Sequence, residues 1–298
     1  MPRHSPSLFR VVLSVWLALG ASLGWAAGRP SAETLLAKQT ELQSQLRASP
    51  SGEPIHLTST EADSRIDGDV YAEAAVPFAR ISTVLRSADS VCGLLFLHLN
   101  VRSCQPGTDA SGATLTLGMG PKQAASDDTS YSMIYRLQVQ QASTNYVWVT
   151  LTAATGPLAT QDYRIVFEAA PLADNRTFLH FGYSYGYGTL AKMIMGVYLT
   201  TTGRNKIGFT VTGTGPDGHP TYVQGERGAL ERNVMRNYLA LVAYAGVTEG
   251  TPQAQTQARL RAWFAMTERH SAQLHELDLN EYLKEKQSDL TRLAAHAP

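Results

Sequence analysis

The sequence has no surplus of charge of either sign, because its 25 Lys and Arg residues balance its 25 Asp and Glu residues. Nucleic-acid binders usually carry a basic surplus or a stripe of Lys and Arg, and neither is found along the chain. We therefore expect no nucleic-acid partner. Long apolar runs are also scarce, and none beyond residue 28 is long and uninterrupted enough to cross a bilayer.

Motifs of metal and phosphate chemistry are missing as well. His270 and His275 are five residues apart, which does not match the His-Glu-x-x-His face of zinc peptidases. The glycines of 182–188 lack the Lys and Ser/Thr of a phosphate-binding loop, and no Gly-x-Ser-x-Gly elbow occurs. We therefore expect neither a metal nor a cofactor.

Cysteine is rare, with only Cys92 and Cys104 in the chain. In an oxidising compartment an even number of cysteines favours a disulfide. The alternative makes Cys92 a nucleophile with His98 as its base, but no second His and no Asn or Asp is placed to complete a recognisable pattern. The sequence therefore predicts a Cys92–Cys104 disulfide.

The N-terminus is typical of a cleaved secretory signal peptide over residues 1–27. Arg3 and Arg10 precede an apolar run, and small residues follow where signal peptidase would cut. The alternative is a membrane anchor, but glycine and serine dilute the second half of the apolar run. Removal of 1–27 leaves 23 Lys and Arg against 25 Asp and Glu, a net charge near −2. We expect a periplasmic or secreted protein.

The remaining chain divides into three parts by pattern. A helical pattern at 31–48 predicts an N-terminal helix within 28–52, which ends at the Pro50-Ser51-Gly52 break. Residues 53–246 form the expected α+β domain, with a turn signal at Asp67-Gly68. Residues 247–298 are expected to form a C-terminal helical extension.

Clear period-two alternation between about 131 and 187 predicts an antiparallel meander. The segment 177–187 is the most informative strand, because Tyr183, Tyr185 and two further aromatic residues share one face and glycines occupy the other. Glycine in a strand often marks a bend, a bulge or the close approach of a ligand or backbone. We expect the glycine face to adjoin either a ligand cavity or a closely packed helix.

Two sets of segments resemble START-like domains, a superfamily that includes lipid-transfer domains and polyketide cyclases. The first set is Gly68–Glu73 leading into Pro77–Leu85. The second set is Gln161–Arg164 with Pro171–Arg176 and Thr177–Tyr183. The resemblance covers about 55–245 and implies an antiparallel sheet gripping a long helix (helix-grip), with extra C-terminal helices here. It also implies a cavity for a small ligand.

The candidate ligand site combines the glycine and tyrosine strand with nearby polar groups. Phenols offer apolar area with a hydrogen-bonding tip, and arginines hold carboxylate or phosphate headgroups. The candidates are Tyr135, Arg136, Arg164, Gly182, Tyr183, Ser184, Tyr185, Gly186, Arg232 and Arg236.

We expect an exported protein that binds or transfers a hydrophobic or amphipathic, lipid-like small molecule in the cell envelope. We also expect peripheral contact with the membrane. One alternative is a cyclase or hydrolase on the same scaffold, with Asp162, His98, His180 and Tyr residues as acid–base groups. The other alternative is a structural or interaction protein of the envelope that uses its C-terminal helices.

Overall fold

The computed structural model describes residues 1, 29–120, 131–189, 192–193 and 206–295. Most of the predicted signal peptide, and most of a helix that the sequence indicates near 189–202, lie outside these residues. Within them, no helix is long and apolar enough to cross a membrane.

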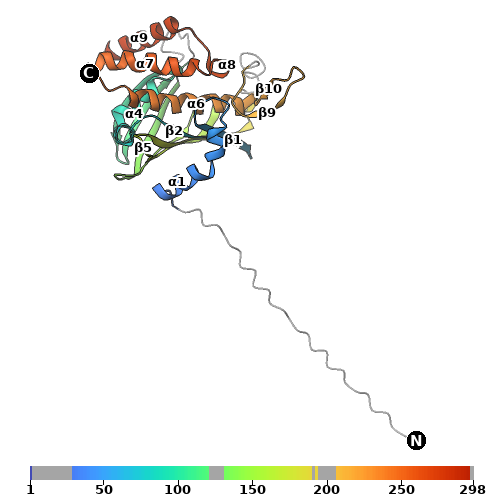
Figure 1. Cartoon of the computed structure of the whole chain (residues 1–298). Coiled ribbons are helices and arrows are strands. Elements are labelled where there is room, and N and C mark those ends of the chain that lie inside the picture. The colour runs from blue at the N-terminus through green and yellow to red at the C-terminus, as the bar shows by residue number, and fades with distance from the viewer. Residues whose placement is uncertain (2–28, 121–130, 190–191, 194–205, 296–298) are drawn as a thin grey trace.

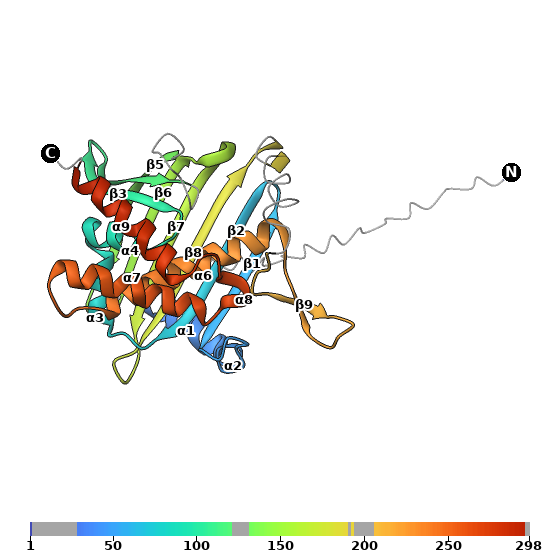
Figure 2. The ribbon, with the colours of Figure 1, turned by 90° about the horizontal axis from the view of Figure 1, so that it is seen from above.

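An eight-stranded antiparallel sheet forms the centre of the molecule, in the order β1-β2-β8-β7-β6-β5-β4-β3 (Figure 2). The strands are β1 (Ile55–Ala62), β2 (Arg65–Ala74), β3 (Val101–Asp109), β4 (Gly112–Met119), β5 (Tyr131–Ala142), β6 (Val147–Thr155), β7 (Thr160–Pro171) and β8 (Thr177–Tyr187). A separate hairpin of β9 (Val211–Thr214) and β10 (Pro220–Tyr222) projects beside it.

The long helix α6 (Gly225–Gly246) lies across one face of the sheet, against β1, β2 and β8. The short helices α3 (Phe78–Leu85) and α4 (Ala88–Phe96) connect β2 to β3 and cover the same face, which we call the inner face. Aliphatic residues of the strands and of α6 fill the space between them. The predicted α+β helix-grip architecture is therefore confirmed.

Part of the outer face of the sheet is covered by the N-terminal helices α1 (Ala32–Glu41) and α2 (Gln43–Arg47), which pack on β7, β8 and β1. Leu35, Leu42 and Leu46 pack there with Tyr146 and Phe178 in a second apolar cluster. Most residues of β8 are therefore buried on both sides of the sheet.

The C-terminal helices α7 (Pro252–Glu268), α8 (Ser271–Leu274) and α9 (Leu279–Ala295) form a further layer outside α6 (Figure 1). The indole Nε1 of Trp263 donates to the carbonyl oxygen of Arg236 on α6, at 3.0 Å. The hydroxyl of Tyr282 on α9 donates to the carbonyl oxygen of Leu97 after α4, at 2.7 Å. These buried hydrogen bonds anchor the layer to the rest of the molecule.

The predicted disulfide is confirmed. Cys92 of α4 is bonded to Cys104 of β3, and their α-carbons are 5.2 Å apart. The bond ties a helix to the edge strand of the sheet, so both cysteines have a structural role.

Candidate functional site

Five tyrosines from the strands β5, β7 and β8 gather on the inner face of the sheet. We call them the tyrosine cluster: Tyr135 of β5, Tyr163 of β7, and Tyr183, Tyr185 and Tyr187 of β8. The rings of Tyr163 and Tyr185 are stacked with centroids 5.2 Å apart, and Tyr183 lies 6.0 Å from Tyr163. Tyr135 meets Tyr163 edge-on at 6.4 Å. The antiparallel register of β7 and β8 pairs Ile165 with Tyr183. Tyr163, two residues before Ile165, therefore lies close to Tyr183 and Tyr185.

The hydroxyl groups of the cluster differ in how they are satisfied. Tyr163 shares a hydrogen bond with Thr160 at 2.7 Å, and Tyr187 donates to Glu61 of β1 at 2.6 Å. Tyr185 is 9% exposed, and its hydroxyl has no hydrogen-bond partner in the part of the chain that the structure describes. The hydroxyl oxygen is not among the fully buried polar atoms that lack a partner, so it can bond to water or to a ligand.

Burial raises the pKa of the cluster's phenols, and neighbouring tyrosines add to the effect for Tyr183 and Tyr185. These phenols are therefore neutral at physiological pH and can donate hydrogen bonds. Tyr183 is half-buried, so part of its side chain remains accessible.

The rim of the tyrosine cluster is formed partly by the turn between β6 and β7. In this turn Leu158 and Ala159 have positive φ angles of 58° and 60°, and Leu158 is 47% exposed. Thr160 donates to the carbonyl oxygen of Pro157 and so connects this turn to the hydroxyl of Tyr163. A side chain at Gly156 would overlap the ring of Tyr163, which explains the glycine.

The structure corrects the interpretation of the glycine face of β8. Gly182, Ser184 and Gly186 point to the outer face, whereas the tyrosines point to the inner face. A β-carbon on Gly182 would lie 3.0 Å from Oδ1 of Asp69 and 3.4 Å from Nε2 of His180. The glycines therefore make room for polar side chains on the outer face. They do not create a space on the inner face beneath α6.

The four predicted arginines do not join the tyrosine cluster. Arg136 and Arg164 lie on the outer face, since Tyr135 and Tyr163 beside them point inward, and Arg136 is 3.7 Å from Asp109. Arg232 and Arg236 lie on the side of α6 away from the sheet. Arg232 donates to the carbonyl oxygen of Ile207, and Arg236 donates to Glu276 at 3.0 Å. The structure therefore does not bring these arginines together with the predicted tyrosines, and their role in holding a headgroup stays a prediction.

The acid–base candidates His98, Asp162 and His180 lie far apart in the fold. His180 lies on the outer face between Asp69 and Glu168, at 2.7 Å from each carboxylate. His98 is buried against the C-terminal layer, where desolvation and then the charge of Arg236 lower its pKa to about 3. Asp162 is exposed on β7. Among the residues that the structure places, no group of three or more His, Cys, Asp or Glu is arranged to hold a metal.

Sequence reasoning identified Tyr135, Tyr183 and Tyr185 and missed Tyr163 and Glu61. Tyr163 was visible as an inward position of the alternating segment 162–168. The pairing of that segment with 177–187 as neighbouring strands would have placed it beside Tyr183. No comparable signal pointed to Glu61, because its hydrogen bond with Tyr187 depends on where β1 lies in the sheet.

No family model matches the chain, and no curated protein matches it in sequence. A conserved protein of unknown function from Enterococcus faecalis has 11% identity and a TM-score of 0.31, over 88% of this chain and 98% of its own. Ara h 8.0201 has 8% identity and a TM-score of 0.36, over 65% and 99%. Norcoclaurine synthase from Thalictrum flavum, in complex with dopamine and hydroxybenzaldehyde, has 14% identity and a TM-score of 0.33, over 48% and 86%. Likenesses at this level carry no argument, so the helix-grip fold of this chain rests on the sheet and helix contacts described above.

Proposed function

We propose that this protein binds, and hands on, a hydrophobic or amphipathic small molecule outside the cytoplasm, on a START-like scaffold. The observation that carries the proposal is the tyrosine cluster on the inner face, with a Tyr185 hydroxyl that has no partner among the described residues and an accessible surface on Tyr183. A dry core would use Leu, Ile or Phe at these positions, because phenol tips cost free energy when they lack a partner.

The charges beside the cluster indicate what kind of headgroup fits. Glu61 accepts the Tyr187 hydrogen bond, and burial and then Glu61 raise the pKa of Glu226 at the start of α6. Lys192 partly offsets these carboxylates. Since none of the four predicted arginines lies here, an uncharged or cationic headgroup suits the site better than a carboxylate or phosphate.

Two observations support export. The first is the tripartite pattern of residues 1–27, and the second is the Cys92–Cys104 disulfide, since disulfides persist mainly in oxidising compartments. Of the acid–base groups of the cyclase or hydrolase alternative, Asp162, His98 and His180 do not converge with the tyrosines in the described structure, which gives binding more support than catalysis.

The test is native mass spectrometry of the mature protein isolated from its own host, followed by analysis of an organic extract. We expect a bound small amphipathic molecule that the Tyr183→Ala and Tyr185→Ala variants lose. Tyr222→Ala, in the hairpin outside the sheet, is the matched control and should retain it. Ligand-free protein in every preparation, or equal loading of all variants, contradicts the proposal.

A further inference from the structure

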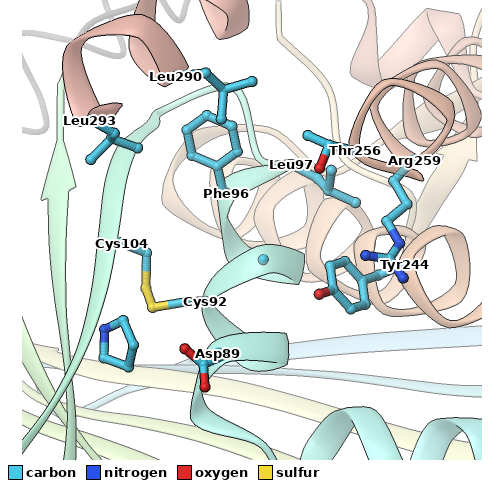
Figure 3. Close-up of a pocket in the computed structure, with 12 residues that line it drawn as sticks. Asp89, Cys92, Phe96, Leu97, Cys104, Tyr244, Thr256, Arg259, Leu290 and Leu293 are labelled. Carbon is cyan, nitrogen blue, oxygen red and sulfur yellow. A yellow bond between two sulfur atoms is a disulfide. The ribbon is translucent and has the colours of Figure 1, made fainter. Parts of the chain in front are cut away.

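A pocket of about 250 Å³ lies between the C-terminal layer and the disulfide, away from the tyrosine cluster. Its walls come from α4, β3, the end of α6, α7 and α9, as Figure 3 shows. We call it the extension pocket, because residues of α7 and α9 complete it.

One side of the extension pocket is apolar. Phe96 of α4 and the half-buried Leu290 and Leu293 of α9 lie together, near the Cys92–Cys104 disulfide (Figure 3). A hydrocarbon chain placed there would lose its contact with water, which favours binding in proportion to the apolar surface removed.

The other side of the extension pocket presents a fixed cation. The guanidinium of Arg259 lies 3.8 Å from the ring centroid of Tyr244. Its Nε and Nη2 both donate to the carbonyl oxygen of Val247, at 3.3 and 3.0 Å. Its Nη1 has no partner among the described residues, and no carboxylate among them lies within ion-pair distance. The charge is therefore held in place and available.

A glycine of α4 makes room for the Tyr244 phenol, over whose ring this cation lies. A β-carbon at Gly93 of α4 would lie 2.5 Å from Cε2 and 2.7 Å from the hydroxyl oxygen of Tyr244. Glycine inside a helix is less favourable than alanine, and here it lets the phenol approach α4. The hydroxyl has no hydrogen-bond partner in the described part of the chain, and Tyr244 lines the pocket together with Arg259, so the hydroxyl can donate to a ligand there.

We infer that the extension pocket binds a short alkyl carboxylate, with its carboxylate on Arg259 and Tyr244 and its chain among Phe96, Leu290 and Leu293. Hydrogen bonds from a guanidinium to a carboxylate are among the stronger ones in proteins. Asp89 at the edge of the pocket is exposed and opposes the bound anion only weakly, through water.

The test is calorimetric titration of the mature protein with octanoate, octylammonium and 1-octanol. We expect octanoate to bind more tightly than the other two. Arg259→Gln should weaken octanoate binding by about tenfold, and Asp89→Asn should strengthen it slightly. Leu290→Trp should block the pocket and abolish binding. Arg47→Gln, on α2 at the far side of the sheet, is the control and should have no effect.

Thermal unfolding of each variant shows whether it is folded. Three results would overturn the inference: no octanoate binding to the parent protein, binding that Arg259→Gln and Leu290→Trp leave unchanged in folded protein, or preferred binding of octylammonium that Asp89→Asn removes.

Discussion

At the scale of single residues, the Asp67-Gly68 pair shows why a local signal can be misread. It predicts a hairpin turn, yet the turn lies at Asp63 and Ser64, which have φ angles of 49° and 70°. Gly68 lies within β2, where a β-carbon would come within 2.8 Å of Leu230 on α6. The glycine serves a helix contact that is distant in sequence, so local pattern cannot reveal it.

His180 provides a prediction at the same scale. Burial alone lowers its pKa, but hydrogen bonds and charges from Asp69 and Glu168 outweigh burial and raise the pKa to about 9. A pKa above the unfolded value of about 6.5 means that the charged imidazole stabilises the fold fully below pH 6.5. This contribution is lost as the pH rises through 9.

His180→Gln should therefore lower the free energy of unfolding at pH 6 by about 1–3 kcal/mol and by clearly less at pH 9.5. Urea denaturation at both values measures the difference. The exposed His219 provides the control, since His219→Gln should change stability little at either pH. An equal loss at both pH values would show that the charge of His180 is not stabilising.

At the scale of elements, the alternation of apolar and polar residues predicted the strands well, because an antiparallel sheet with one buried face requires that alternation. It did not show which side of β8 faces α6. Residues on both sides are buried, since Phe181 packs beneath α6 while Phe178 packs with α1 and α2. Likewise α6 is covered on two sides, so Arg232 and Arg236 could not be assigned to a face from the sequence.

Helix α9 is held by a buried ion cluster that the sequence did not reveal. Asp289 is 1% exposed and lies 2.8 Å from Arg102 of β3, and Lys286 donates to the carbonyl oxygens of His98 and Val101. Removal of one partner from a buried pair leaves an uncompensated charge and costs about 3–5 kcal/mol.

Asp289→Ala should lower the free energy of unfolding by about 3–5 kcal/mol. It should also release α9 from the rest of the molecule. Urea denaturation measures the loss, and limited proteolysis between α8 and α9 reports the release. Glu285→Gln affects a more exposed pair at 3.5 Å from Arg102, so it should cost less than about 1 kcal/mol. A similar small effect of both variants would contradict this account of the cluster.

The disulfide makes a second prediction at this scale. It closes a loop of 12 residues between α4 and β3, so on the chain-entropy model its loss should cost about 3 kcal/mol. The double variant Cys92→Ser/Cys104→Ser should unfold at correspondingly lower urea concentration. Unchanged stability would show that α4 and β3 are held together by packing alone.

At the scale of the whole molecule, the N-terminal pattern predicts an exported protein. Amino-terminal sequencing of the protein from the host envelope should begin between Ala26 and Gly28. Recovery of intact Met1 in the membrane fraction would instead show an anchor.

The central claim is that the tyrosine cluster contacts a small amphipathic ligand. The most direct measurement is NMR of protein with isotope-labelled tyrosine rings, titrated with the molecule extracted from the native protein. We predict shifts for the ring signals of Tyr163, Tyr183 and Tyr185, and none for Tyr222 or Tyr146. Binding that moves no ring of the cluster, or an extract that contains no molecule able to bind, would contradict the account.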